Sequence, residues 1–376
     1  MNHESAIKSW SDFPVDIQSV IMEHLYFDDQ IRFRAVCKSW QCNTYAIKSA
    51  DQLPWLFTYD YNQDDKVSGF CYLYNPSKKT KYEIKKKLPF GSRFHDSKYG
   101  WILISKVNKN VHCYSAHRLL FVFYNPFTDE TIKLPVPERP LDIHDSWLIF
   151  SGNPTSKECV IFGHGISMEL YTCRPGDTRW TRHYCLEYFG RDILSLACVD
   201  GVLYCAYSAS RFGGEKIWLS SFKIIAKQQK IVFDPIDVLS FAIPSRAIYR
   251  CKLIESDGNL LLTYPEDDDD SCVVFRVDFS EKKLVEFGNL EKKMLCKGSG
   301  KYTLVPLMEA AIELANTVHH NCFIKFDSHF YKAPKTHFCT PQPYDWIKKP
   351  EKSEYESNWI QPPLHVTRFQ KNHYSC

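Results

Sequence analysis

The chain has 376 residues, of which 44% are hydrophobic, 24% are charged and 15% are aromatic, and its formal net charge is +3. This composition is that of a folded globular protein, and the length allows two domains or one large repeat fold with a substantial core. The nearly balanced charge gives no electrostatic indication of nucleic-acid binding. The N-terminal residues lack the pattern of a signal peptide, and the longest apolar run, residues 119–124, is too short for a membrane span.

The cysteines point to a reducing compartment. There are 15 of them, an odd number, and they are scattered without a regular spacing, so we expect reduced and mostly buried thiols. The two Asn-x-Ser/Thr sequences, at Asn75 and Asn153, both have Pro in the middle position, which blocks glycosylation. We therefore expect a protein of the cytoplasm or the nucleus that is not inserted in a membrane.

The first elements predicted along the chain are three short helices. Pro14 suits the first turn of a helix, and Asp16 stands where the helix dipole favours an anion. Asp28 is the predicted cap of a second helix, and a third short helix is expected to carry Trp40 and Ala46. The apolar residues of the first helix have the spacing of a single stripe: Ile17, Val20, Ile21 and Leu25. Three short helices bury too little surface to be stable alone, so we expect them to bind a partner or a neighbouring domain.

Two sequences in these helices, "FPVDI" at residues 13–17 and "RFRAVCKSW" at residues 32–40, resemble an F-box. In that family the helices bind a Skp adaptor, which connects the protein to a cullin, so the resemblance implies a substrate-recognition subunit of a ubiquitin ligase. Phe13 stands where the family usually has Leu, and Gln30 stands at a position that is usually apolar. The residues that match the family's apolar docking and core positions are Phe13, Pro14, Ile17, Ile21, Leu25, Ile31, Val36 and Trp40.

Beyond about residue 50 the pattern changes to short alternating runs typical of strand, turn and strand. The turns of six predicted hairpins are spaced 47–53 residues apart. They fall at Asn75, Asn125, Arg174, Lys227, Ser280 and Asp327. This regularity indicates a repeat fold.

Between these hairpins lie further apolar runs that predict inner strands, and Asp200-Gly201 and Asp257-Gly258 predict tight two-residue turns. Four strands in about 50 residues are typical of a propeller blade. The length predicts six blades, with seven as the alternative, and an ordinary two-sheet sandwich remains open.

The sequences "YNPFTDETIKLP", "DGVLYCAY" and "WIQPPLHV" resemble the plant F-box proteins whose C-terminal region is classed as domain of unknown function 295. That resemblance implies a propeller placed after an F-box. We therefore expect a small all-α domain of three helices over residues 1–48, followed by an all-β propeller over residues 49–376.

The sequence predicts no catalytic, cofactor or metal site. The run "KGSGK" at residues 297–301 lacks the first glycine of a phosphate-binding loop, and His319-His320 with Cys322 has no second pair of metal ligands. We therefore expect a non-catalytic receptor that binds Skp, and through it cullin, together with a protein target. Two alternatives remain: an enzyme with His, Asp or Glu side chains converging at a propeller channel, and a scaffold that does not lead to degradation.

Overall fold

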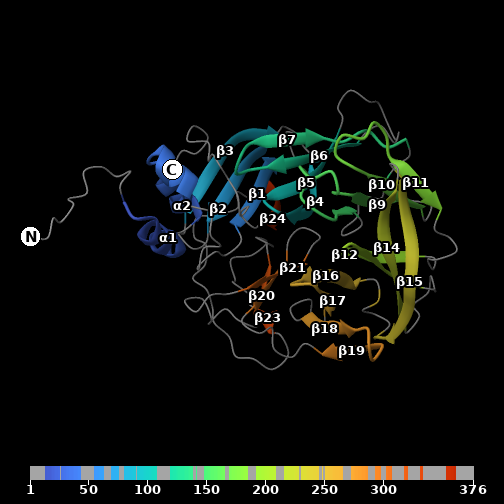
Figure 1. Cartoon of the computed structure of the whole chain (residues 1–376). Coiled ribbons are helices and arrows are strands. Elements are labelled where there is room, and N and C mark those ends of the chain that lie inside the picture. The colour runs from blue at the N-terminus through green and yellow to red at the C-terminus, as the bar shows by residue number, and fades with distance from the viewer. Residues whose placement is uncertain are drawn as a thin grey trace, which may run out of the picture.

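The chain folds as a small helical region, residues 13–43, followed by a strand region that extends to residue 360 (Figure 1). Coiled ribbons occupy one side of the molecule in Figure 1, and the sheets follow one another around a common centre. The computed structural model describes residues 13–25, 27–43, 55–62, 69–75, 80–89, 91–107, 119–138, 141, 148–165, 169–184, 192–208, 216–227, 230–244, 248, 250–265, 272–286, 293–297, 302–306, 317–320, 331–332 and 353–360.

The helical region has the three helices that the sequence predicts: α1 (Val15–His24), α2 (Phe27–Arg34) and α3 (Lys38–Asn43). The first helix begins directly after Pro14, whose carbonyl accepts a hydrogen bond from the Gln18 N–H at 3.0 Å. The prediction that Asp28 caps the second helix is wrong, because α2 begins at Phe27 and Asp28 lies in its first turn. The third helix carries Trp40 as expected, while Ala46 lies outside the described residues.

None of the helices in the described ranges has the length and apolar character that crossing a bilayer requires.

The strands of the described residues form six four-stranded sheets. From its inner strand outward, sheet 1 is β24 (Ser353–Ile360), β1 (Trp55–Asn62), β2 (Gly69–Asn75) and β3 (Thr80–Leu88). In the same direction, sheet 2 is β4 (Arg93–Lys98), β5 (Trp101–Val107), β6 (Leu119–Asn125) and β7 (Glu130–Lys133). Sheet 3 is β8 (Leu148–Phe150), β9 (Ile161–His164), β10 (Glu169–Cys173) and β11 (Thr181–Tyr184).

The remaining sheets follow the same plan from the inner strand outward. Sheet 4 is β12 (Asp192–Val199), β13 (Val202–Ser208), β14 (Lys216–Lys227) and β15 (Lys230–Ala242). Sheet 5 is β16 (Lys252–Ser256), β17 (Asn259–Pro265), β18 (Cys272–Asp278) and β19 (Lys283–Glu286). Sheet 6 is β21 (Tyr302–Pro306), β20 (Lys293–Lys297), β22 (Thr317–His320) and β23 (Tyr331–Lys332). Six separate sheets exclude the alternative of a two-sheet sandwich.

The predicted hairpins are the outer pairs of these sheets. Five of these outer pairs are antiparallel and consecutive in the chain: β2–β3, β6–β7, β10–β11, β14–β15 and β18–β19. They confirm the turns predicted at Asn75, Asn125, Arg174, Lys227 and Ser280. The turn predicted at Asp327 lies outside the described residues.

The inner hairpins of sheets 4 and 5 turn at Asp200-Gly201 and Asp257-Gly258, as predicted. Both residues of each turn have positive φ, 46° and 77° in the first turn and 50° and 74° in the second. Short hairpins favour this geometry because it matches the twist of the strands. A third turn of the same kind, Tyr99-Gly100 between β4 and β5, has φ of 55° and 79°. The sequence did not indicate it, because a bulky Tyr stands where Asn or Asp is the usual signal.

Neighbouring sheets are connected through buried polar side chains on their inner strands. Both β4 and β12 contain a β-bulge, and each bulge is followed by a fully buried polar residue. Asp96 Oδ2 accepts the N–H of Phe150 in sheet 3 at 3.1 Å, and Ser195 Oγ accepts the N–H of Leu253 in sheet 5 at 2.9 Å. The same arrangement therefore joins sheet 2 to sheet 3 and sheet 4 to sheet 5.

The apolar core lies in the seams between consecutive sheets. Between sheets 1 and 2, Phe57 packs against Phe94 and Tyr124, with ring centroids 5.2 and 6.0 Å apart. Between sheets 2 and 3, the rings of Phe123 and Phe150 are 5.0 Å apart. Further clusters of buried residues fill the seams between sheets 3 and 4 and between sheets 4 and 5. Burial of aromatic side chains on this scale stabilises the strand region through the hydrophobic effect.

Candidate functional site

The helical region has a small aromatic core around Trp40. Its side chain is 5% exposed, and its ring stacks on Phe33 with centroids 4.1 Å apart and an interplanar angle of 27°. Phe13 packs on the same ring at 5.9 Å. Trp40 and Phe13, both predicted to bind an adaptor, thus contribute to the packing of the helical region itself.

The buried side of α1 differs from the apolar stripe that the sequence indicates. Gln18 and Met22, one helical turn apart, are both fully buried. The Gln18 side-chain amide donates to the carbonyl of Phe13 at 2.6 Å, which holds the chain leading into the helix. The stripe residues Ile17 and Val20 therefore face away from the core of the helical region.

Gln30 explains a departure from the F-box pattern. Its side chain is 2% exposed, and its amide donates to the carbonyls of Met22 at 2.9 Å and Leu25 at 3.2 Å. The last carbonyls of a helix have no partner within the helix and need one from elsewhere. Gln30 thus reaches from α2 to cap the end of α1, a role that an apolar side chain cannot fill.

The helical region presents large apolar side chains to solvent. Ile17 is 43% exposed and Val20 is 52% exposed on α1, with Val15 at 47% at the start of that helix and Val36 at 51% after α2. Because Ile17 and Val20 are three residues apart, they are neighbours on one side of α1. We call these four residues the exposed apolar surface. Exposed apolar side chains that are neighbours, as Ile17 and Val20 are, are common at sites of protein interaction.

The predicted docking residues fall into several groups. Ile17 and Val36 belong to the exposed apolar surface, Pro14 is exposed, and Ile21 and Leu25 are half-buried. Ile31 lies in α2, but its side chain is outside the described residues. Val15 was missed because it stands before the periodic stripe begins.

A second group of polar residues lies where the inner strands of sheets 2 and 5 meet. Lys98 Nζ lies 3.7 Å from Glu255 Oε2. Burial opposes the charged form of Lys98, but the carboxylates of Asp96 and Glu255 together outweigh it and raise the pKa of the lysine. Asp96 accepts the Ser97 N–H at 2.8 Å through Oδ1, and its Oδ2 accepts the N–H of Phe150 in sheet 3. These charged groups are therefore engaged with one another and with backbone.

Burial dominates the environment of several reactive side chains in the described part of the strand region. Burial raises the pKa of the Cys71, Cys159 and Cys173 thiols to about 12. Burial also lowers the pKa of His95 to about 3, and its Nε2 lies 2.8 Å from Ser105 Oγ. Within the described ranges, no three His, Cys, Asp or Glu side chains form a group that could hold a metal ion.

The sequence "YNPFTDETIKLP" forms the β6–β7 hairpin, and its residues have structural roles. Asn125 Oδ1 accepts the N–H groups of Phe127 at 2.9 Å and Thr128 at 3.2 Å, which fixes the turn. Phe127 is fully buried and its ring lies 5.4 Å from that of Trp55 in sheet 1. The hairpin therefore anchors sheet 2 on sheet 1.

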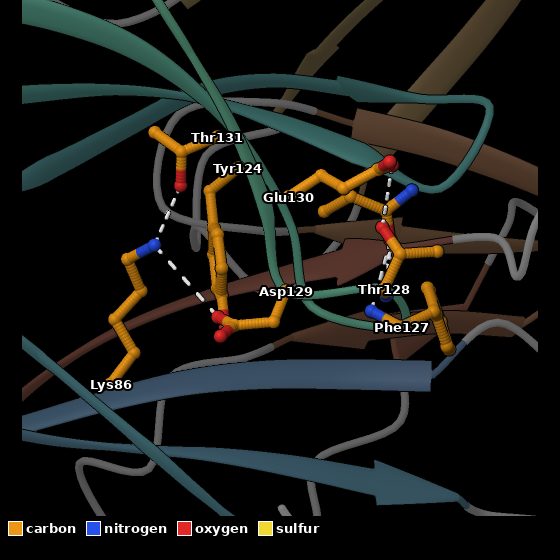
Figure 2. Close-up of polar contacts among 8 residues, drawn as sticks. Lys86, Tyr124, Phe127, Thr128, Asp129, Glu130 and Thr131 are labelled. Atoms are coloured by element: carbon orange, nitrogen blue, oxygen red, sulfur yellow. Dashed lines mark hydrogen bonds and ion pairs between the residues drawn. The ribbon is translucent and has the colours of Figure 1, made fainter. Parts of the chain in front are cut away.

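Figure 2 shows a polar contact that accompanies this anchor. Lys86 of β3 extends across the seam and donates to Thr131 Oγ1 at 2.6 Å. Its Nζ lies 3.8 Å from Asp129 Oδ1 and 4.3 Å from the centroid of the Tyr124 ring. Asp129 has a φ of 60°, a left-handed conformation that Asp adopts more readily than most residues.

Comparisons with known proteins give two family matches. The model of the F-box domain matches residues 10–42, and the model of the KIB1-4 beta-propeller matches residues 45–332. An F-box/kelch-repeat protein of Arabidopsis thaliana is 31% identical over an alignment of 220 positions, which covers 54% of this chain and 55% of that protein. The chain thus spans about half the length of this relative. An F-box protein of the same plant is 22% identical over an alignment of 377 positions, which covers 96% of this chain and 90% of that protein.

Among solved structures, a luciferin-regenerating enzyme is similar at a TM-score of 0.34 and 11% identity, covering 85% of this chain and 97% of that chain. A score this low supports no inference about function.

Proposed function

Because this chain belongs to the KIB1-4 beta-propeller family and carries an F-box domain ahead of the propeller region, we propose that it is a substrate-recognition subunit of a Skp–cullin–F-box ubiquitin ligase. F-box proteins generally have this role. In the proposal the helical region binds a Skp-type adaptor, and the strand region holds a protein target. The chain then acts in the cytoplasm or the nucleus.

The observation that carries the proposal is the exposed apolar surface of the helical region. Ile17 and Val20 are turned to solvent although the buried side of the same helix includes the polar side chain of Gln18. Exposing apolar side chains while burying a polar one is unfavourable for an isolated region. It becomes favourable when a partner covers the apolar side chains.

The proposed adaptor-binding residues divide into two kinds. We infer that Pro14, Ile17, Ile21, Leu25, Ile31 and Val36 contact the adaptor, and that Val15 and Val20 extend this contact. Phe13 and Trp40 act indirectly, because their packed rings hold α1 and α3 in position. The helical domain in this proposal spans residues 1–48 and the propeller residues 49–376.

We further propose that the six sheets are the six blades of a closed propeller. The inner strands contact one another in space in the order β24, β4, β8, β12, β16 and β21. Strand β20 of sheet 6 in turn lies near β24. The last described strand, β24, is antiparallel to β1 and pairs with it along its whole length. The first pair is Trp55 with Ile360 and the last is Asn62 with Ser353, so β24 completes sheet 1. The Lys98–Glu255 ion pair joins sheets 2 and 5, which stand opposite each other in a ring of six.

The mechanism that this arrangement supports is proximity. The receptor holds a target close to the ubiquitin-loaded enzyme, which raises the effective concentration of the target's lysines. Such a receptor needs no acid, base or nucleophile of its own. The structural engagement of Asp96, Lys98 and Glu255 favours this mechanism over an active site at the propeller centre.

Affinity purification of the tagged full chain from plant cells, compared with a variant lacking residues 1–45, tests the proposal. The full chain is expected to recover a Skp-type adaptor and a cullin, and the truncated variant to lose both. Absence of adaptor binding by the full chain at micromolar concentration would contradict the proposal. A target that is recovered, but whose level does not rise when the protein is removed, would instead indicate a scaffold.

A further inference from the structure

Strand β15 has a long free edge. It is the outer strand of sheet 4, spans 13 residues and pairs on one side with β14 along its whole length (Figure 1). The outer strands β7, β11 and β19 each span 4 residues. Propeller folds usually leave short and protected edges, because the unpaired N–H and C=O groups of a long edge can bind a strand of another molecule. A strand as long as β15 therefore calls for a feature that prevents such pairing.

The side chains on this edge favour association. Ile236 is 57% exposed and Val238 is 51% exposed, the highest values among the large apolar residues in the described part of the strand region. A long edge strand with exposed apolar side chains is a site where aggregation is expected. Every copy of the chain carries the same edge, so two copies can pair through β15 with two-fold symmetry.

Two features in the middle of β15 oppose this pairing. A β-bulge interrupts the ladder with β14, and Ile236 is the extra residue between Pro235 and Asp237. Pro235 has no N–H group to donate to another strand. Bulges and prolines are common on protected edge strands, because each breaks the regular row of donors and acceptors that a second strand needs.

Asp237 closes the edge at the next position. The carbonyl of Asp237 accepts the Ser221 hydroxyl of β14 at 3.3 Å, so this carbonyl points toward β14. In a trans peptide the N–H of the following residue points the opposite way, so the Val238 N–H points toward the free edge. Asp237 Oδ1 accepts this N–H at 2.8 Å. The carboxylate thus occupies the place that the carbonyl of an added strand would take.

The second oxygen of the same carboxylate is directed toward sheet 5. Asp237 Oδ2 lies 3.6 Å from Nζ of Lys282, which lies in the β18–β19 turn. Asp96 has a similar arrangement on the inner strand β4: it follows a bulge, accepts the Ser97 N–H through Oδ1 and bonds to sheet 3 through Oδ2. The geometry that connects two sheets in the interior therefore also covers a backbone donor at the free edge of β15.

We propose that Asp237, together with Pro235 and the bulge, keeps β15 from pairing with β15 of a second copy of the chain. The carboxylate removes a donor from the edge, and it places a negative charge where an incoming strand would bury it. Each of the two copies would bring one such charge into the contact. The inference is independent of the proposed ubiquitin-ligase role, because it concerns the association of the chain with itself.

Sedimentation velocity of full-chain variants, from low to high micromolar concentration, tests the inference. The original chain is expected to be a monomer. The double variant Pro235→Thr, Asp237→Val is expected to dimerise with a Kd in the micromolar range, because it restores a donor and uncovers another. The matched control is Pro235→Thr, Asp234→Val, which removes the same charge and adds the same side chain at an exposed position of β15. This control is expected to remain a monomer.

A third variant separates the covered donor from the charge. Pro235→Thr, Asp237→Asn keeps an oxygen that can accept the Val238 N–H but has no charge. It is expected to dimerise at least about tenfold more weakly than the valine variant. Equal Kd values for the asparagine and valine variants would overturn the assignment of edge closure to the bond with Val238.

Hydrogen exchange, measured below and above the Kd of the double variant, locates the contact. The amides of β15 are expected to exchange more slowly in the dimer, while those of sheets 1, 2 and 3 remain unchanged. Adding Val238→Lys to the double variant is expected to restore the monomer, because an exposed lysine on an edge strand opposes pairing. Asp237→Val alone is a milder variant that retains Pro235, and it is expected to dimerise more weakly than the double variant.

The contrary outcomes are equally clear. A folded double variant that stays monomeric would overturn the inference, as would a dimer whose protected amides lie outside β15. Dimerisation of the Asp234 control to the same extent would show that added apolar surface drives association, and would also overturn it. If neither Asp237→Val variant folds, as judged by thermal unfolding, then Asp237 is required for the fold itself and the inference fails.

Discussion

The helical region and the strand region of this protein differ in how far their large apolar side chains are buried. In the helical region the buried side of α1 is Gln18 and Met22, while Ile17 and Val20 face solvent. In the strand region, aromatic side chains such as Phe57 are fully buried between sheets. The difference shows that the strand region has a large core of its own, whereas the helical region has a small core and leaves several large apolar side chains exposed, which the proposed adaptor would cover.

The two regions also differ in how polar side chains stabilise them. Gln30 caps a single helix within the helical region. Asp96 and Ser195 each connect the inner strands of two sheets, across 54 and 58 residues of sequence. Substitutions in one region should therefore leave the other unchanged.

The largest expected effect is on the apolar core between sheets 1 and 2 of the strand region. Phe57→Ala removes a fully buried ring that packs on Phe94 and Tyr124, and it should lower the free energy of unfolding by about 3–5 kcal/mol. Urea unfolding followed by fluorescence measures this change. The matched control is Phe279→Ala, which truncates a ring that is 39% exposed and should cost about 1 kcal/mol or less. Equal losses for the two variants would show that the seam between sheets 1 and 2 is not a packed core.

The next effect is local to the helical region. Gln30→Ala leaves the carbonyls of Met22 and Leu25 without this cap, which should destabilise the end of α1 by about 1–3 kcal/mol. Hydrogen exchange should accelerate in α1 and remain unchanged in the sheets. Glu23→Ala, at an exposed position of the same helix, is the control. Unaltered exchange in α1 after loss of Gln30 would contradict the capping role.

Mild acid should destabilise the strand region. Burial lowers the pKa of His95 to about 3 and that of His183 to about 4, so both are neutral in the folded state near pH 5. The unfolded chain binds protons at these side chains below its ordinary pKa of about 6.5, so stability falls as the pH drops from 6.5 to 5. His95 alone should contribute about 1.4 kcal/mol per pH unit once the pH is well below 6.5. His95→Gln should flatten the pH dependence, and an unchanged slope would show that His95 is protonated in the fold.

The smallest expected effect tests whether the sheets close into a ring. A double-mutant cycle with Lys98→Met and Glu255→Gln should give a coupling energy of about 0.5–1 kcal/mol, because both side chains keep some contact with solvent. Lys283 and Glu281 offer a reference, since they form an exposed ion pair at the β18–β19 turn of a single sheet and should show a coupling energy of about 0.5 kcal/mol or less. Additive effects of Lys98→Met and Glu255→Gln would contradict the contact between sheets 2 and 5.

Local chemistry made much of the fold predictable from the sequence. Pro14 stands directly before α1. In the turn at Asn125 the Asn125 side chain accepts the Phe127 N–H, and in the turn at Ser280 the Asp278 side chain accepts the Ser280 N–H. The inner turns at Asp200 and Asp257 follow from the same reasoning. Each of these signals lies within a few residues of the structure it specifies.

Features that depend on distant contacts could not be predicted. The periodic stripe identified apolar residues of α1 but not which side is buried, because that depends on contacts with another helix, such as the bonds from Gln30 of α2 to the carbonyls of Met22 and Leu25. The bond from Asp96 to Phe150 and the ion pair of Lys98 join strands that no local pattern relates.

The most direct test of the difference between the two regions is a calorimetric titration of a purified Skp-type adaptor into the full chain. Micromolar or tighter binding is expected, and the double variant Ile17→Asp, Val20→Asp should weaken it by roughly 100-fold or more, because two charges would be buried against an apolar partner. The Tm of the strand region should not change, and Glu23→Gln should bind like the original chain. Retained affinity in the double variant would contradict the assignment of the exposed apolar surface to the adaptor.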